Sequence, residues 1–220
     1  MNYKQAIATV DVVLLTLIKG KLNVVLLQRD APPFKDQLAL PGGYVHTETD
    51  MDSRGAARRV LEAKTGIAAP YLEQLYTFSG PDRDPRGWSF SVTFYALVDE
   101  SVLAQRKAED VVLVPVDQLP ELAFDHNEIV EFARKRVQDK SSYSTLPCYL
   151  LPKEFTLTEL QTTYEQAMAG SLDKSSFRRK LDELDFLEAV PAGFRQGKHR
   201  PAQLYRIKRE KSLTLFDRPV

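Results

Sequence analysis

Arginine side chains in two segments are the first residues whose chemistry suggests a ligand. Arg83 and Arg86 lie in the segment 81–88 (PDRDPRGW), and Arg29 follows an apolar run earlier in the chain. A guanidinium group donates paired hydrogen bonds to phosphate or carboxylate oxygens. We therefore predict that these three arginines bind a diphosphate or ribose. The alternative for Arg83 and Arg86 is a turn held by local pairs with its own aspartates.

Other residues complete this candidate ligand site. Gly42 and Gly43 form a turn whose backbone a ligand can approach closely, because glycine has no side chain. Trp88 offers an aromatic face for stacking on adenine. The pair Asp125-His126 adds polar groups, with a helix cap and a surface histidine as the alternative. The predicted ligand-binding residues are Arg29, Lys35, Gly42, Gly43, Arg83, Arg86, Trp88, Asp125 and His126.

Hydrophobic patterning predicts the elements that position these residues. Strands are expected over 10–18, 22–27, 88–98 and 111–116. Asp52 can cap a helix that runs to Thr65 and is ended by Gly66. A second helix is expected over 128–138, with Ile129, Phe132, Ala133 and Arg136 at helical spacing. This mixture of strands and helices predicts an α/β domain over residues 1–140.

The segment from Leu40 to Ile67 resembles the Nudix box, which reads approximately G-x5-E-x7-R-E-U-x-E-E-x-G-U, with U aliphatic. The matching residues are Gly43, Arg59, Leu61, Gly66 and Ile67. The resemblance implies a Nudix fold over roughly residues 5–140, with a mixed sheet between helices. In Nudix hydrolases the glutamates of the box hold divalent metals, which help a water molecule attack a nucleoside-diphosphate linkage. The segment 81–88 resembles the ADP-ribose branch of this family.

The metal-binding residues of the box are replaced in this sequence. Val60 stands where the box has the glutamate after its arginine, and Ala63 and Lys64 replace the paired glutamates. Because valine and alanine cannot coordinate a metal and lysine repels one, we predict no metal site, no catalytic residues and no enzyme activity. The alternative, an active ADP-ribose pyrophosphatase, needs replacement carboxylates from Glu48, Asp50, Asp52 or Glu62.

The C-terminal third has the pattern of a DNA-binding domain. Thr156 and Glu159 form a capping box at the start of a helix that Gly170 closes. Asp173 caps a second helix, and strands over 186–190 and 203–207 follow, flanking a loop. A helix-turn-helix followed by a hairpin is the order of elements in a winged helix. The alternative is a small helical hairpin docked on the first domain.

The distribution of charge also favours DNA as a partner of this part. Residues 151–220 hold 13 Lys and Arg against 10 Asp and Glu, whereas the first 150 residues hold 17 against 20. Basic clusters of this kind often contact nucleic acid. We expect a linker over 141–152 and a winged helix-turn-helix domain over 153–220. The predicted DNA-binding residues are Lys174, Ser175, Ser176, Arg178, Arg179, Arg195, Lys198, His199 and Arg200.

Composition excludes several other classes of protein. With 43% hydrophobic and 27% charged residues, the chain is typical of soluble globular proteins. The single cysteine, Cys148, excludes an internal disulfide and a cysteine-rich zinc site. The longest apolar run, 10–18, is far too short to span a membrane. The sequence therefore predicts a cytoplasmic protein with no membrane partner.

The combination of an altered Nudix box and a winged helix, in this order, is similar to the Nudix-related transcriptional regulators called NrtR. The similarity includes the segments 155–161, 177–180 and 197–206. It implies a homodimeric repressor of NAD-metabolism genes that binds a palindromic double-stranded operator and is released by ADP-ribose, with no required cofactor. Two alternatives remain: a pyrophosphatase with an appended DNA-binding module, and a regulator of sugar catabolism that senses a sugar phosphate.

Overall fold

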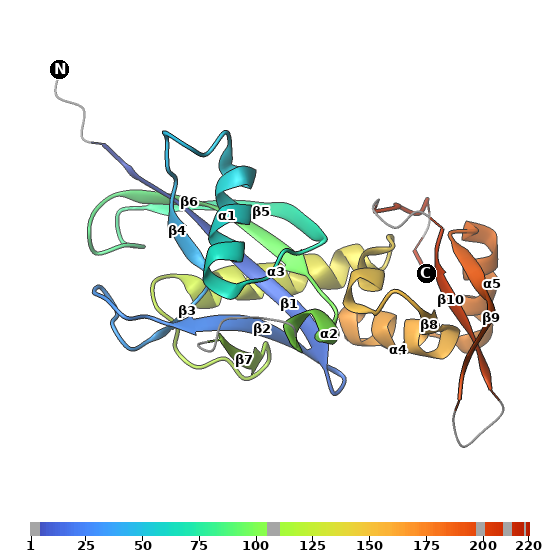
Figure 1. Ribbon diagram of the computed structural model, residues 1–220. Helices are drawn as coiled ribbons and strands as arrows, with labels where there is room; N and C mark the ends of the chain where they lie inside the picture. Colours follow the sequence, from blue (N-terminus) through green and yellow to red (C-terminus); the bar gives the residue numbers. More distant parts are fainter. Residues whose placement is uncertain (1–4, 105–110, 197–200, 209–212, 218) are drawn as a thin grey trace.

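The computed structural model describes residues 5–104, 111–196, 201–208, 213–217 and 219–220. It has two units, each built on its own sheet (Figure 1). The sheet of the first unit has seven strands. Five of them lie side by side in the order β3-β2-β1-β6-β5, and the other two, β4 and β7, pair with β1 and β2 respectively. Its strands are β1 (Ile7–Ile18), β2 (Lys21–Gln28), β3 (Leu38–Ala39), β4 (Gly42–Tyr44), β5 (Tyr71–Gly80), β6 (Ser89–Leu97) and β7 (Val111–Pro115).

The central strand β1 explains why this sheet is mixed. It pairs in parallel with β6 on one side, while the other side pairs antiparallel with two strands in succession. Residues 9–11 of β1 pair with β4, and residues 15–18 pair with β2. One long strand therefore brings the loops before and after β4 close to the start of β6. The helices of this unit are α1 (Ser53–Thr65), α2 (Glu100–Ala104) and α3 (His126–Ser141).

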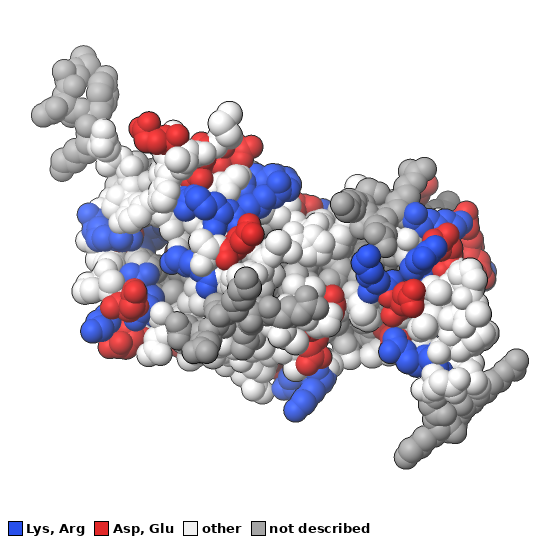
Figure 2. All heavy atoms as spheres, in the orientation of Figure 1, with Lys and Arg blue, Asp and Glu red and all other residues white. Residues whose placement is uncertain are grey.

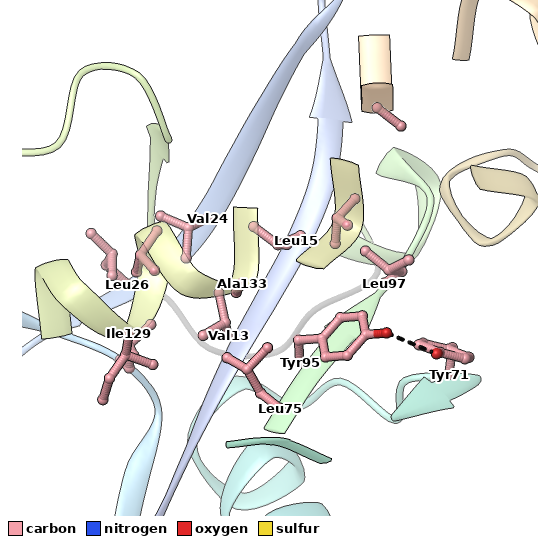
Figure 3. Close-up of a cluster of buried hydrophobic side chains, with 14 of the residues drawn as sticks. Val13, Leu15, Val24, Leu26, Tyr71, Leu75, Tyr95, Leu97, Ile129 and Ala133 are labelled. Atoms are coloured by element: carbon pink, nitrogen blue, oxygen red, sulfur yellow. Dashed lines mark hydrogen bonds between the residues drawn. The ribbon is translucent and has the colours of Figure 1, made fainter. Parts of the chain in front are cut away.

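The two faces of the sheet follow the alternation of side chains along β1, which points successive residues to opposite faces. Val13 and Leu15 lie in a buried cluster with Ile129 and Ala133 of α3 (Figure 3). Their neighbours in the sequence, including Leu14, lie in a second cluster with α1. The sheet is therefore enclosed between α1 and α3, and the predicted α/β fold with a mixed sheet between helices is confirmed.

Helix α1 forms as its sequence predicts. The Asp52 carboxylate accepts a hydrogen bond from the backbone N–H of Gly55 at 2.6 Å, and Gly66 ends the helix with a φ of 69°. Glycine adopts this left-handed conformation with little steric cost, because it has no Cβ atom. Both ends of α1 are therefore fixed by local sequence.

Strand β5 and helix α3 differ from expectation. Strand β5 was not predicted, because its buried residues do not alternate regularly and its pairing with β6 shifts register between Gln74 and Tyr76. Helix α3 begins earlier and ends later than expected. Phe132, predicted at the same spacing as Ile129, is 38% exposed. The buried positions of α3 include Val130 and Val137 instead.

The second unit has the predicted helix-turn-helix and hairpin. Its elements are β8 (Phe155–Thr156), α4 (Leu157–Met168), α5 (Lys174–Leu184), β9 (Leu187–Arg195) and β10 (Ala202–Ile207), with the sheet order β8-β10-β9. The capping box of Thr156 and Glu159 is formed, and Asp173 caps α5. Ala169, rather than Gly170, takes the left-handed position at the end of α4.

The expected linker is folded into both units. Leu146–Leu150 forms a 3-10 helix in which Leu146 is buried with α3, whereas Cys148 is buried with the core of the second unit. The segment is also tied to the end of the chain, since Phe216 donates its backbone N–H to Tyr143 at 2.7 Å. The domain boundaries at 140 and 153 stay predictions. No helix in the described ranges is long and apolar enough to cross a membrane.

Candidate ligand pocket and DNA-binding surface

A cavity of about 640 Å³ lies in the first unit, beside β4 and α1. Its volume falls in the range of small-molecule sites. Of the nine predicted ligand-binding residues, six line it: Arg29, Gly42, Gly43, Arg83, Arg86 and His126. Lys35, Trp88 and Asp125 are not lining residues. The ligand-binding roles of all nine stay predictions.

Asp11 lies at the base of this cavity, and sequence patterns did not predict it as a ligand-binding residue. It accepts a hydrogen bond from the Ser91 hydroxyl at 2.6 Å and lies 3.6 Å from Nε2 of His126 and 3.7 Å from Nη2 of Arg83. Burial by itself raises the pKa of Asp11, but His126, the Ser91 hydroxyl and Arg83 together outweigh it, so the pKa lies below its ordinary value. Asp11 is the single charged residue in the apolar run 10–18, and this isolated charge could have identified it as a candidate site residue.

His126 is buried, so the alternative of a surface histidine is wrong. Its Nδ1 accepts a hydrogen bond from the backbone N–H of Leu40 at 2.9 Å. Because Nδ1 acts as the acceptor, any proton on the ring is carried by Nε2, which faces Asp11. The histidine therefore joins the turn before β4 to the base of the cavity.

Arg83 is held by a residue far away in the sequence. Its Nε and Nη2 each donate to one carboxylate oxygen of Asp125 at 2.9 Å, and its Nη1 donates to the Ser89 hydroxyl at 3.3 Å. The Arg83 side chain is only 8% exposed. The alternative of a local pair within the turn is therefore wrong for Arg83. Asp125 orients a cavity residue without lining the cavity itself.

Arg86 does form the local pair. It donates to both oxygens of Asp84, at 2.9 and 2.6 Å, and its guanidinium lies 5.3 Å from the centre of the Tyr44 ring. Phe124 adds a second ring to the cavity wall, with the guanidinium of Arg29 4.8 Å from its centre. Sequence patterns did not identify Tyr44 or Phe124, because their position depends on contacts between distant segments.

Two further cations line the cavity without forming an ion pair with any described carboxylate. Arg29 donates to the backbone carbonyls of Pro33 and Ala31, at 2.8 and 3.2 Å. Burial, and then repulsion by Arg86, lowers the pKa of Arg29. The Lys64 side chain is partly open to solvent, but its partial desolvation at the cavity wall, and then repulsion by Arg29, lowers its pKa. Like charges gathered around a cavity are relieved by an anion, so this wall suits phosphate oxygens.

The residues of the altered Nudix box do not fit a divalent metal site. Val60 is buried against Gly43, and it lines the cavity together with Ala63 and Lys64. Among the described residues, no three His, Cys, Asp or Glu side chains are grouped closely enough to hold a metal. The donor set at this wall is cationic and apolar, whereas magnesium prefers carboxylate and water oxygens.

The four carboxylates required for the active-enzyme alternative either bind other groups or lie outside the cavity. Asp50 binds Nε and Nη2 of Arg59 at 2.7 and 2.6 Å, and the Arg59 hydrogen bonds lower the pKa of Asp50 to about 2. Asp52 caps α1. Glu48 and Glu62 are exposed and do not line the cavity.

In the second unit, α5 presents part of the predicted DNA-binding surface. Lys174, Ser175, Ser176 and Arg179 are exposed, while Phe177 and Leu181 face the core. Arg178 is half-buried, and its Nε is shielded without a hydrogen-bond partner among the described residues. Arg195 is exposed and lies 3.3 Å from Glu159. Lys198, His199 and Arg200 lie outside the described residues.

The surface of α5 changes character along its length. Its first half carries the basic and hydroxyl side chains, whereas its second half exposes Asp182 and Glu183, and Glu183 lies 3.9 Å from Arg179. Basic and acidic side chains are interspersed over both units on the face drawn in Figure 2. A phosphate backbone would attract the first half of α5 and repel the second.

Comparison with known proteins assigns both units. The family model described as a NUDIX domain matches residues 7–133, and the model described as an NrtR DNA-binding winged helix domain matches residues 147–207. Over 211 residues, the chain is 40% identical to the "ADPR responsive transcriptional repressor NtrR" of Acinetobacter baylyi, covering 94% of this chain and 84% of that protein. It is also 32% identical over 116 residues to an ADP-ribose pyrophosphatase of Methanocaldococcus jannaschii, covering 52% and 68% of the two chains.

Solved structures give the same assignment. NrtR of Shewanella oneidensis, complexed with a 27mer DNA, is 36% identical with a TM-score of 0.87, over 97% of this chain and 99% of that chain. The NUDIX domain of the same protein, complexed with ADP ribose, is 37% identical with a TM-score of 0.56, over 61% of this chain and 90% of that domain. The chain therefore belongs to the NUDIX family and, with its winged helix domain, to the NrtR family.

Proposed function

We propose that the protein is a transcriptional repressor of NAD-metabolism genes whose Nudix domain binds ADP-ribose and thereby releases the operator. The observation that carries this proposal is the cavity wall in which Arg29 and Lys64 form no ion pair with a described carboxylate. The same chain carries an exposed basic half-helix on a winged helix. The Acinetobacter relative is named as an ADPR-responsive repressor, and its name supports the same pairing of ligand and DNA.

The cavity offers suitable partners to the diphosphate and the adenine of ADP-ribose. Arg29 and Lys64 would neutralise the diphosphate, since a charge-assisted hydrogen bond contributes about 1.5–3 kcal/mol. The rings of Phe124 and Tyr44, which lie near Arg29 and Arg86, provide aromatic surface for adenine. Arg83 also lines the cavity, where both oxygens of the Asp125 carboxylate hold its guanidinium in the free protein.

Ligand binding without hydrolysis is the second part of the proposal. Val60 and Ala63 supply no metal ligands, and Lys64 adds a positive charge at the same wall. The Methanocaldococcus relative is an ADP-ribose pyrophosphatase and favours the active alternative. Against that alternative, Asp50 is held by Arg59 and Asp52 caps α1, so neither is available for a metal.

We also propose that the protein acts as a homodimer on a palindromic operator. One winged helix contacts only a short stretch of DNA, and two copies related by a twofold axis match the two half-sites of a palindrome. The half-sites should lie one or two helical turns apart, at about 34–36 Å per turn. The first half of α5, from Lys174 to Arg179, would enter the major groove.

A fluorescence-anisotropy titration tests this function. The operator would be a duplex selected from a random library with the full-length protein, and it would be titrated with and without ADP-ribose. We expect ADP-ribose to weaken operator binding, whereas AMP, ribose 5-phosphate and a panel of sugar phosphates should not. Equal operator affinity with and without ADP-ribose would reject the effector role, and a response to a sugar phosphate alone would favour the regulator of sugar catabolism.

A further inference from the structure

Asp125 occupies the N-cap position of α3 but does not cap it. An aspartate at this position usually accepts hydrogen bonds from backbone N–H groups in the first turn of its helix. Within the described part of the chain, α3 receives no such side-chain bond, and the Asp125 carboxylate is taken up by Arg83 at 2.9 Å through both oxygens. Its φ of −93° and ψ of 21° are not the extended conformation of a capping residue, so Asp125 reaches this second partner in its own helix only if its backbone changes as well.

The residues on either side of Asp125 also belong to the ligand cavity. Phe124 and His126 both line it. Phe124 has a φ of 57°, a left-handed conformation that is unfavourable for a bulky residue and has to be held by its surroundings. Its ring packs against Phe34 with 4.8 Å between centres. The start of α3 is therefore part of the wall that a ligand touches.

Arg83 lies between two carboxylates. Asp125 binds it through two hydrogen bonds, and Asp11 lies 3.7 Å from its Nη2. Arg83 lines the cavity, so a diphosphate bound there presents oxygens to the same guanidinium. Phosphate and carboxylate oxygens bind guanidinium in the same paired geometry, so the two compete for its N–H groups.

The far end of α3 reaches the DNA-binding unit. The helix has 16 residues and is therefore about 24 Å long at 1.5 Å per residue. Lys140 near its end donates to Glu73 of β5 at 2.5 Å. Three residues after the helix, the carbonyl of Ser144 accepts a hydrogen bond from the hydroxyl of Tyr164 on α4 at 2.9 Å.

Apolar packing strengthens this connection. Ala133 and Val137 of α3 belong to the same buried cluster as Ala167 of α4, and the two helices lie side by side. Figure 1 shows α3 crossing the first unit and ending beside α4. Helix α4 is the first helix of the winged helix, so α3 packs directly against the unit that carries α5.

We propose that Asp125 is a positioning residue that exchanges partners when the cavity fills. In the free protein it holds Arg83, and when a diphosphate binds Arg83, the Asp125 carboxylate turns to cap α3. The exchange changes how α3 begins, and α3 transmits the change to α4. This inference rests on the proposed function and specifies how ligand binding is coupled to release of DNA. Because coupling is reciprocal, operator DNA should favour the Asp125–Arg83 pair and weaken ADP-ribose binding by the same factor.

Two substitutions of Asp125 distinguish its two functions, which are to hold Arg83 and to cap α3. Asp125→Asn keeps the size of the side chain and its ability to cap, but removes the charge that holds Arg83. We expect this variant to favour the arrangement in which residue 125 caps α3. Operator affinity without ADP-ribose should then fall about fivefold, which is the equilibrium shift typical of one N-cap. Addition of ADP-ribose should change the operator affinity of this variant less than that of the wild type. Asp125→Ala can neither hold Arg83 nor cap, so its coupling should also fall. The matched control is Asp139→Asn, the same charge change at an exposed position of the same helix.

Hydrogen exchange on the full-length protein distinguishes this exchange of partners from a purely structural role of Asp125, because a structural role would not make exchange depend on the ligand. In the wild type, ADP-ribose should slow exchange of the backbone N–H groups of Asn127 and Glu128, and in Asp125→Ala it should not. Unchanged exchange at these two amides, with wild-type coupling in Asp125→Asn, would overturn the proposal. If ADP-ribose binds but leaves operator affinity unchanged in the wild type, the proposed function fails, while the exchange data still decide whether Asp125 changes partner.

Discussion

Gly42 stands directly opposite Asp11 on the neighbouring strand, and a Cβ atom on Gly42 would lie 1.9 Å from Oδ1 of Asp11. The space that a side chain would occupy is therefore filled by the Asp11 carboxylate. From the sequence, we expected this glycine to let a ligand approach the backbone. The structure shows that the glycine first makes room for the carboxylate at the base of the cavity.

Gly42→Ala should displace Asp11 and disrupt its contacts with Ser91 and His126. We expect a loss of about 1–3 kcal/mol in the free energy of unfolding, because a buried carboxylate loses hydrogen bonds. Denaturant unfolding measures this loss, and calorimetry should show weaker ADP-ribose binding. Gly170→Ala is the control, since a Cβ there meets no atom within 4 Å. Equal stability of the two variants would show that Asp11 can relocate without cost.

Arg29→Ala and Lys64→Met should each weaken ADP-ribose binding tenfold or more. Each removes a cation from the cavity wall, and one charge-assisted hydrogen bond corresponds to about 1.5–3 kcal/mol. Arg58→Ala is the control, because Arg58 is exposed on the same helix as Lys64 and does not line the cavity. Isothermal titration calorimetry compares the three variants. A larger effect at Arg58 than at Lys64 would mean that the ligand binds elsewhere.

Affinity for ADP-ribose should fall as the pH rises through the pKa of Lys64. Burial and repulsion by Arg29 place that pKa below the value of an ordinary lysine, so the loss should begin at a lower pH than for a free lysine side chain. The diphosphate binds the charged form, and binding is therefore accompanied by proton uptake in this pH range. Titrations from neutral to alkaline pH should show this decline in the wild type. The same decline in Lys64→Met would assign the titration to another group.

ADP-ribose should stay intact during incubation with the protein and magnesium. The residues at the Nudix box position supply no metal ligands, so the several kcal/mol that metals contribute to the transition state are lost. Chromatography of the nucleotides measures the release of AMP. Steady release of AMP that Glu62→Gln abolishes would show that the box is still catalytic.

Lys174→Ala combined with Arg179→Ala should weaken operator binding strongly and reduce its salt dependence. Each lost phosphate contact lowers the slope of log affinity against log salt by about one, whereas a lost base contact relaxes specificity. Arg134→Ala is the control, because Arg134 lies on α3 and pairs with Glu131. Anisotropy titrations at several salt concentrations provide the slopes. An unchanged slope would mean that α5 does not contact the DNA backbone.

Local sequence determined both ends of α1 and the starts of α4 and α5. Asp52, Gly66 and Asp173 act where they were expected, because a cap is a hydrogen bond or a backbone conformation within a few residues. The altered Nudix box and the helix-turn-helix with its hairpin were also readable, since both are patterns of adjacent residues. These patterns were enough to identify the family.

Tertiary structure alone decided which polar groups meet in the cavity. Arg83 finds Asp125 across 42 positions, and Asp11 finds Ser91 across 80. Such pairs depend on which strands lie side by side, and the parallel pairing of β1 with β6 is not encoded in either strand by itself. From the sequence, Arg83 could pair with an aspartate in its own turn, and Asp125 could cap its own helix. In the structure these two residues bind each other instead. A charged side chain removed from water takes whichever partner the packing of distant elements brings within reach.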